Sequence, residues 1–428
     1  MSITPNNLRL PILFCSLFLS ITLFSQIRIA SPYSRFGIGN LSDNNSAWNM
    51  TMGQLGIGLR SSSHVNYSNP ASYTAFDSLS FVFDGGFNSQ FVTLSSSAQS
   101  VSRNYASLGC LLFGMPVNKW WKTSLGLVPF SDVGYNIEIP NSDKTIGKRV
   151  GIYAGSGGIN RLYWGNGFQL SKKFSAGFNI SYLFGSMKRE ETASFPDSAY
   201  TLNARQSYYI SVNDLLVDFG AQYRTKIKED MFLNLGVVYS PSLSLAAKTD
   251  VLAYTFMNGT SGTELSRDTI IQMTGYTGKI VIPMMIGGGF SLEKTDKWMI
   301  GLDCKWQNWK NFRAFNLSDS LVNSFHVSIG GEIIPKIDNY TNFLARMHYR
   351  LGFSINKTYL RLRGNNIYEK SVSFGFGIPL RGMKTMLNIG GEYGSQGNTS
   401  QDLIRESYFK VVIGFSIYER WFVKRKYF

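Results

Sequence analysis

The sequence predicts an all-β protein: a transmembrane antiparallel β-barrel of about 14 strands with an N-terminal hatch in its lumen. Three observations lead to this fold class. Only 16% of the 428 residues are charged, whereas a soluble domain carries about 25%. Aromatic residues reach 14%, although the mean hydropathy is only −0.07. Apolar residues therefore alternate with polar ones along the chain and do not gather in long apolar runs.

The first 25 residues have the pattern of a cleavable signal peptide. Arg9 supplies positive charge, the stretch 10–24 is largely apolar, and Ser25 offers a small residue for cleavage. This apolar stretch is shorter than a membrane-spanning helix needs to be. We therefore predict residues 1–25 to be a secretory signal and exclude them from the fold.

Residues 26–77 differ from the rest of the chain, since they are rich in Gly, Ser and Asn and show few long alternating runs. We interpret this segment as a compact, irregular hatch that plugs the barrel or lies beneath it. A barrel of about 14 strands encloses more space than wall side chains alone can fill, so a filler is expected.

Residues 78–422 show the period-two pattern of β-strands. In 174–184, for example, Phe174, Phe178 and Tyr182 share one face while Ser175 and Asn179 share the other. About 14 such runs occur, and each reaches the ~9–11 residues that a tilted strand needs to cross a bilayer. We assign 78–422 to the barrel and the basic residues 423–428 to a short periplasmic tail.

Short and long connections alternate between these runs, as they do in outer-membrane barrels with short periplasmic turns and long outer loops. An even number of strands then leaves both chain termini in the periplasm. In hydrocarbon every backbone donor and acceptor must be paired, so the sheet has to close on itself. The predicted location is the bacterial outer membrane, with outer-membrane lipids as partners.

The formal net charge of +15 raises the possibility of nucleic-acid binding. The basic residues are scattered over many short turns, such as Lys172 and Lys173, and do not form one helix or patch. We therefore expect no nucleic-acid partner. A basic rim that faces anionic lipid headgroups and a solvated rim without a specific partner are both compatible with this pattern.

Several short motifs, taken in order, resemble the FadL-type long-chain fatty-acid transporters in their Bacteroidetes form. The segment 31–39 looks like the mature start of those proteins, and Asn69-Pro70-Ala71 looks like the motif that ends their hatch. Further similarity lies at 163–165, 181–185, 306–309, 349–352, 392–394 and 421–425. The resemblance covers nearly all of the predicted mature chain.

The resemblance implies passive uptake of hydrophobic compounds such as long-chain fatty acids. Ligand would be captured by apolar outer loops and would leave sideways through the wall near a kinked strand. The capture residues would be Leu252, Tyr254, Phe256 and Met257, although the long loops are otherwise polar. Pro283 with Gly287, Gly288 and Gly289 marks either this lateral kink or a harmless bulge.

A second function remains open, because some family members in this phylum look like non-transporting structural subunits of larger outer-membrane complexes, either type IX secretion or barrel-assembly machinery. A transporter should have an apolar pocket beside the hatch and an open lateral path. A structural subunit should have an obstructed lumen and a conspicuous partner surface.

Catalysis is not expected, because the chain has only three histidines and general-base catalysis needs a positioned base. A lumen network that pins the hatch is predicted from His326, Glu332, Arg346, His348 and Arg350. Binding of a carboxylate ligand by Arg346 or Arg350 and a Ser-His-Glu set are the alternatives. We expect no enzyme activity, no cofactor and no metal.

Overall fold

The computed structural model describes residues 29–42, 46–97, 99–143, 147–197, 201–258, 263–339, 341–380 and 384–420. The predicted signal peptide, residues 1–25, and the predicted tail, residues 423–428, lie outside this part. No helix in the described part is long and apolar enough to cross a membrane.

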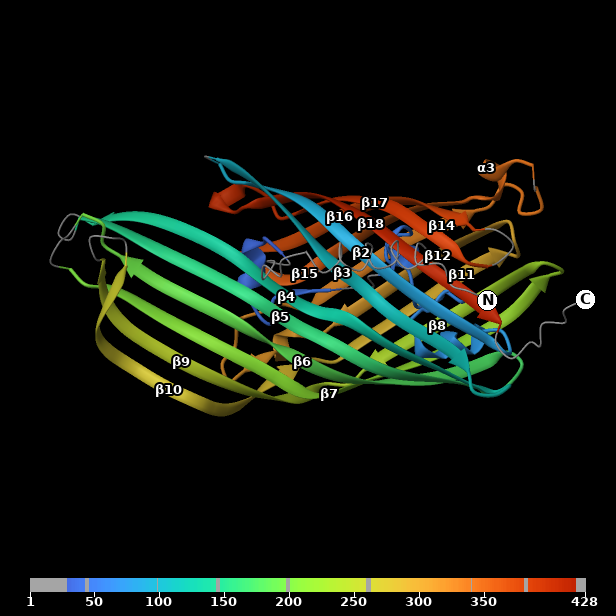
Figure 1. Ribbon diagram of the computed structural model, residues 1–428, viewed down its shortest axis with the longest axis horizontal. Helices are drawn as coiled ribbons and strands as arrows, with labels where there is room; N and C mark the ends of the chain where they lie inside the picture. The colour runs from blue at the N-terminus through green and yellow to red at the C-terminus, as the bar shows by residue number, and fades with distance from the viewer. Residues whose placement is uncertain are drawn as a thin grey trace, which may run out of the picture.

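One antiparallel sheet of 18 strands contains the wall, and it closes where the last strand pairs with the first long one (Figure 1). The strands are β1 (Asn40–Leu41), β2 (Ser80–Ser95), β3 (Ser100–Pro116), β4 (Trp121–Asp143), β5 (Gly147–Gln169), β6 (Phe174–Ser194), β7 (Asn203–Lys228), β8 (Met231–Ser240), β9 (Leu243–Asn258), β10 (Glu264–Ile282), β11 (Met285–Lys294), β12 (Trp298–Gln307), β13 (Arg313–Ala314), β14 (Ser324–Ile333), β15 (His348–Leu362), β16 (Asn365–Pro379), β17 (Met386–Gln396) and β18 (Arg405–Arg420).

The wall has 14 transmembrane strands, as predicted. β1 and β13 are two-residue strands. Pro241 and Ser242 separate β8 from β9, and both of these strands pair with β7. Pro283 and Met284 separate β10 from β11 in the same way. A proline cannot donate a ladder hydrogen bond, so each interruption divides one long strand into two labelled strands.

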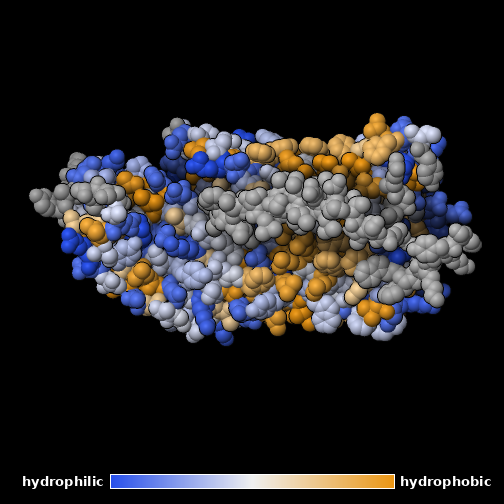
Figure 2. Space-filling view, viewed as in Figure 1, coloured by the Kyte–Doolittle hydropathy of each residue, from blue (hydrophilic) through white to orange (hydrophobic). Residues whose placement is uncertain are grey.

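Side chains alternate between the lumen and the outside, as period-two strands require. On β15, Leu351 and Phe353 are exposed on the outer surface whereas Arg350 and Ser354 are buried inside. Hydrophobic side chains gather over the middle and right of the molecule in Figure 2, while hydrophilic ones dominate its left end. The apolar band fits contact with lipid hydrocarbon.

The strands differ greatly in length, so the barrel is much taller on one side. β12 has 10 residues and β14 has 10, but β4 and β5 have 23 each and β7 has 26. The long strands extend to the left in Figure 1. We call the outer parts of β4, β5, β6, β7, β9 and β10 the projecting wall.

Two segments lie inside the lumen and divide it along the barrel axis. The strap, residues 29–42, contains the 3-10 helix η1 (Pro32–Arg35) and β1. The hatch, residues 46–77, contains α2 (Ala47–Met50) and η2 (Pro70–Ala75). The loop 308–323, with η3 (Trp309–Asn311) and β13, lies beside the strap. Two further short helices, α3 (Phe343–Arg346) and η4 (Ser400–Asp402), belong to connections outside the lumen.

Candidate functional site

The Asn69-Pro70-Ala71 motif lies at the start of η2 and is fully enclosed. The Asn69 side chain caps this helix by accepting a hydrogen bond from the Ala71 backbone N–H at 3.1 Å. Its amide group donates to the carbonyl oxygen of Ile57 at 2.9 Å and reaches that of Ala221 on β7 at 3.3 Å. The motif therefore ties the end of the hatch both to the hatch itself and to the wall.

The hatch rests directly on wall backbone at a ring of glycines, which we call the glycine belt. A Cβ atom added to Gly220 would lie 2.1 Å from Asn69 Oδ1, and one added to Gly352 would lie 2.0 Å from the backbone nitrogen of Gly53. Many of these glycines face one another across neighbouring strands. The belt consists of Gly167, Gly177, Gly220, Gly236, Gly330, Gly352, Gly375 and Gly390. No larger residue fits at this contact, so the sequence here is set by the close approach of the hatch.

Asp303 on β12 holds the middle of the hatch. Its carboxylate accepts hydrogen bonds from the backbone N–H groups of Gly56 at 2.7 Å, Ile57 at 2.8 Å and Gly58 at 3.4 Å. The residue is 1% exposed, and three donors on one carboxylate offset part of the cost of burying its charge. Sequence analysis missed Asp303, because a single acidic residue in an alternating strand carries no pattern.

Asp77, the last residue of the hatch, binds the hatch to the wall. Its carboxylate accepts from Lys384 Nζ and from the Tyr418 hydroxyl, each at 2.7 Å. Partial burial opposes ionisation of Asp77, but these two hydrogen bonds outweigh it and hold the pKa of the carboxyl below its usual value.

Three of the five residues predicted as a lumen network come together. Glu332 lies 3.0 Å from His348 Nδ1 and 2.6 Å from Arg350 Nε. Arg350 also donates to Asn388 at 2.7 Å. The cluster links β14, β15 and β17 across the inner wall, near the end of the barrel with short turns.

The other two predicted residues lie elsewhere. Arg346 belongs to α3, outside the lumen. His326 lies toward the far end of β14 from Glu332, six residues away on an extended strand 10 residues long. In the Ser-His-Glu alternative, His326 and Glu332 therefore lie toward opposite ends of the strand. His348 does contact Glu332, but no hydroxyl contact of His348 appears among the described residues.

Toward the end of the barrel with long hairpins, the strap and the loop 308–323 close the lumen. Ile38, Trp309, Phe312 and Leu321 are buried together in one apolar cluster with the inner face of the wall. The Gly37 N–H donates to Asp319 Oδ2 at 2.7 Å, and the Tyr359 hydroxyl donates to the Gly39 carbonyl at 2.6 Å. These contacts join strap, loop and wall into one layer.

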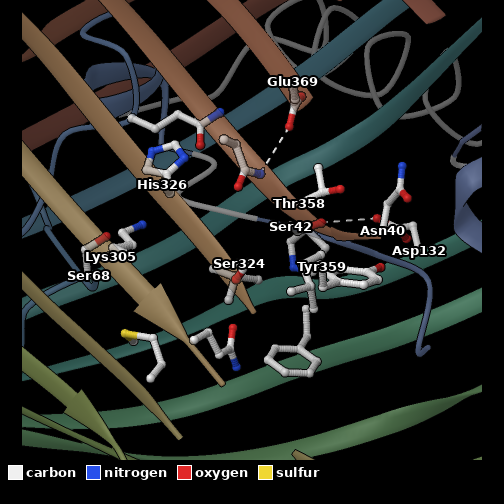
Figure 3. A pocket seen from close by; sticks show the side chains of 18 of the residues that line it. Asn40, Ser42, Ser68, Asp132, Lys305, Ser324, His326, Thr358, Tyr359 and Glu369 are labelled. Atoms are coloured by element: carbon white, nitrogen blue, oxygen red, sulfur yellow. Dashed lines mark hydrogen bonds between the residues drawn. The ribbon is translucent and has the colours of Figure 1, made fainter. Parts of the chain in front are cut away.

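A chamber of about 360 Å³ remains between the hatch and this layer. Gln54, Tyr67 and Ser68 bound it on the hatch side, and Leu41, Ser42 and Trp309 bound it on the other. Lys305, Ser324 and His326 are drawn together on neighbouring strands of its wall in Figure 3. Charged residues of both signs line it: Asp132, Asp218, Glu369, Glu406, Arg161, Lys305 and Lys410.

Hydrogen bonds and ion pairs connect many of these lining groups. Arg161 lies 3.1 Å from Asp218, and the Tyr408 hydroxyl donates to Glu369 at 2.8 Å. Sequence analysis did not identify these residues. Their inward positions could be deduced from strand alternation, but the strands that contribute them are far apart in the sequence.

The wall beside the chamber is interrupted between β3 and β4. β3 pairs with β4 only over Leu111–Pro116, and beyond that point β4 pairs with the strap instead, at Asn40 and Leu41. A register shift in β4 between Pro129 and Ser131 accompanies the change of partner.

The residues predicted as a lateral kink lie elsewhere. Pro283 does break a strand, but Gly287, Gly288 and Gly289 on β11 are paired on both sides, with β8 and β12, without a register shift. They therefore lie in a continuous part of the wall.

The predicted capture residues belong to a strand and not to a loop. Leu252, Tyr254, Phe256 and Met257 lie on β9, which pairs with β7 on one side and β10 on the other. Leu252 is exposed whereas Phe256 is buried beneath the guanidinium of Arg205. The four side chains therefore do not form a single open apolar surface.

The wall and the filled lumen together define a transmembrane β-barrel with a FadL-like fold. The chain superimposes on the Pseudomonas putida toluene transporter TodX with a TM-score of 0.58 at 15% identity, over 89% of this chain and 99% of that one. The CymD monoaromatic hydrocarbon channel gives 0.57 at 13% identity, over 89% and 98%. A Pseudomonas aeruginosa FadL homologue gives 0.55 at 12% identity, over 90% and 99%.

Within this class, residues 8–428 match the BamG family, and the chain belongs to that family. A search of curated proteins found no match. The structural relatives share too little sequence to establish more than the fold.

Proposed function

We propose that this protein is a non-transporting structural subunit of a larger complex in the bacterial outer membrane. The observation that carries the proposal is that the lumen is closed at two levels. The hatch is seated on wall backbone at the glycine belt, and the strap and loop 308–323 close the opposite side through a buried apolar layer.

The chamber between these two closures is chemically unsuited to an apolar solute. Binding sites for small hydrophobic molecules are lined mainly by apolar and aromatic side chains. Here four carboxylates and three cationic side chains line the space beside apolar and aromatic residues such as Phe130, Leu216 and Trp309. An apolar molecule entering it would displace hydrogen-bonded water from charged groups, which cancels the gain from leaving bulk water.

Of the complexes considered, we favour the barrel-assembly machinery over type IX secretion. We base this preference on the name of the family to which the chain belongs, BamG. The wall geometry supports membership of some complex, because a projecting wall extends beyond the lipid-facing band. We also place both chain termini at the periplasmic face, since short turns in such barrels are periplasmic.

Uptake of hydrophobic compounds is the second candidate, and two observations favour it. The β3–β4 ladder is interrupted next to the chamber, and three proteins with a similar fold are named as a toluene transporter, a hydrocarbon channel and a FadL homologue. If this function holds, the strap would act as the closure of a lateral path. Long-chain fatty acids are then one possible class of substrate.

The first experiment is purification of the tagged full chain from outer membranes in mild detergent, followed by mass spectrometry of co-eluting proteins and lipophiles. A stoichiometric protein partner without an enriched lipophile supports the structural role. A barrel that elutes alone with a bound lipophile contradicts it.

A disulfide across the strap–β4 contact separates the two candidates further. Leu41 and Ser131 are antiparallel partners, and such pairs have Cα atoms about 4.5–5.5 Å apart, within disulfide range. The variant Leu41→Cys with Ser131→Cys should leave a structural role intact in oxidising conditions. Uptake of labelled toluene or oleate that falls on oxidation and returns on reduction would instead establish transport; each single cysteine variant is the control.

A further inference from the structure

One edge of β10 is largely unpaired among the described residues. β10 pairs with β9 along its whole length. On its other side, the described residues that pair with it are Arg313 and Ala314 of β13, opposite Val281 and Ile280, and Phe315, whose N–H donates to the Lys279 carbonyl at 2.9 Å. Residues 264–277 are all exposed. We call residues 264–278 the β10 edge.

The β10 edge lies beyond the lipid. β11, which continues the same strand, has 10 residues paired on both sides, and this length alone crosses a bilayer. On the neighbouring β9, Lys248 and Asp250 are exposed, and Lys248 lies opposite Thr277. Charged side chains on the outward face do not fit within hydrocarbon.

Apolar side chains nevertheless cluster on this edge. Leu265 is 52% exposed, Ile270 62%, Ile271 40% and Met273 42%. Lipid covers such residues within the membrane band, but it cannot reach residues further out than Lys248. An open strand edge with exposed apolar side chains outside the membrane is a template for pairing with another chain.

The β4 edge, on the opposite side of the projecting wall, shows how this chain protects an edge. Pro129 and Pro140 interrupt its donors. The strap covers part of it, since Ser31 and Ser42 donate to the carbonyls of Gly134 and Phe130 at 2.8 and 3.0 Å. The β10 edge contains neither proline nor lysine.

We propose that the β10 edge receives an extended, uncharged segment of another protein of the same complex, which adds to the sheet as a further strand. This inference rests on the proposed function and names the surface that the subunit offers. The interaction is β-strand addition, in which backbone hydrogen bonds supply affinity and alternate side chains supply specificity.

The chemistry of the edge defines the partner segment. From Thr269 to Gly278 the strand carries no charged side chain. The charged residues lie at the tip, where Glu264 pairs with Arg205 at 2.6 Å. Register shifts against β9 fall between Ser266 and Thr269, Thr269 and Ile271, and Met273 and Tyr276. The added strand would therefore pair in a short run at Ile271–Met273, since the Phe315 ring already lies against Gly278 and 6.2 Å from the Tyr276 ring.

A second copy of this chain does not fit the edge. Two copies in one membrane share an orientation, so a two-fold axis between them runs along the membrane normal. Strands tilted by about 35–45° would then cross at roughly 70–90°, too steeply for a ladder. A flexible or extended segment from a different protein has no such restriction.

The first test is site-specific photo-crosslinking in native membranes. The photoreactive residue p-benzoylphenylalanine is placed at Ile270 or Met273 in the full chain, and at Ile139 on β4 as the control, since Ile139 is 50% exposed in the same projecting wall. The inference expects one discrete heterologous adduct from both β10 positions and none from Ile139. An adduct between two copies of this chain would overturn it.

The second test measures whether the partner forms backbone hydrogen bonds with the β10 edge. In an antiparallel edge strand about half of the amides point away from the paired neighbour. Deuterium exchange of the segment 269–278 should therefore be fast at about half of its amides in the isolated barrel and slowed in the purified complex. A partner that crosslinks but leaves this segment unprotected contacts the wall without adding a strand, and the inference is then wrong.

Matched variants introduce charge on the β10 edge or on the β4 edge. Ile270→Lys with Met273→Lys, probed through a photoreactive residue at Ile271, should lower the adduct yield by about tenfold, because lysine blocks edge pairing; Ile139→Lys should not. An unchanged yield, or a stable complex without any β10 adduct, overturns the inference and leaves the proposed function standing. A barrel that purifies without any partner overturns the proposed function as well.

Discussion

The hatch and the chamber share one lumen, but they are built in opposite ways. The hatch touches wall backbone at the glycine belt and its buried polar groups are anchored at Asp303 and Asn69. The chamber is hollow, and charged side chains line it together with apolar and aromatic ones. The difference indicates that the hatch is a permanent part of the barrel core, whereas the chamber contributes little to stability.

The largest effect is expected from the ion cluster beside the hatch. Arg350→Met leaves Glu332 buried with only His348 as a partner, so the unfolding free energy should fall by about 3–5 kcal/mol. Urea unfolding of the purified barrel in detergent measures this. The control is Arg363→Met, since Arg363 pairs with Asp402 on the surface and its side chain is 57% exposed; its loss should stay below about 1 kcal/mol.

Removal of the carboxylate that holds the hatch should come next. Asp303→Ala leaves the N–H groups of Gly56 and Ile57 without their acceptor, at a cost of about 3 kcal/mol. The hatch should then become the first site of limited proteolysis. Asp303→Asn keeps an acceptor oxygen and should lose less; equal losses from both variants would show that the hydrogen bonds are not the cause.

A single methyl group at the glycine belt tests whether the hatch is truly seated on backbone. Gly352→Ala places a Cβ against Gly53 and should cost about 1–3 kcal/mol in the same unfolding experiment. Gly288→Ala is the matched control, because its added Cβ has no neighbour nearer than 4.0 Å. If both variants unfold alike, the hatch has room to move and the contrast with the chamber fails.

The smallest effect is expected in the chamber. Asn356→Ala removes a hydrogen bond of 3.4 Å to Glu369 and should change the unfolding free energy by at most about 1 kcal/mol, with the yield of any co-purifying partner unchanged. A loss as large as that of Asp303→Ala would show that the chamber walls are structural as well.

The wall could be predicted from the sequence almost strand by strand, because alternation is a local property of each strand. The run at 174–184, for example, lies within β6, Phe174–Ser194. The lumen cluster of Glu332, His348 and Arg350 followed from the same alternation. His326 and Arg346 were grouped with it wrongly, since alternation gives the face of a residue but not its height in the barrel.

The height of residues in the barrel also explains the other differences between prediction and structure. Leu252, Tyr254, Phe256 and Met257 were assigned to a loop because the length of a strand beyond the membrane has no separate signal. A lateral kink or a harmless bulge was predicted at Pro283 and the following glycines, whereas the wall is interrupted at β3–β4, where the strap replaces β3 as the partner of β4.

The sequence by itself determined that this chain forms a transmembrane barrel of 14 strands, since the two-residue period and the alternating connection lengths suffice for that. Only the tertiary structure decided that a glycine belt seats the hatch, that one carboxylate on β12 anchors it, and that a polar chamber and an open β10 edge remain. These features join residues far apart in the chain, and their positions depend on register and closure, which no local pattern encodes.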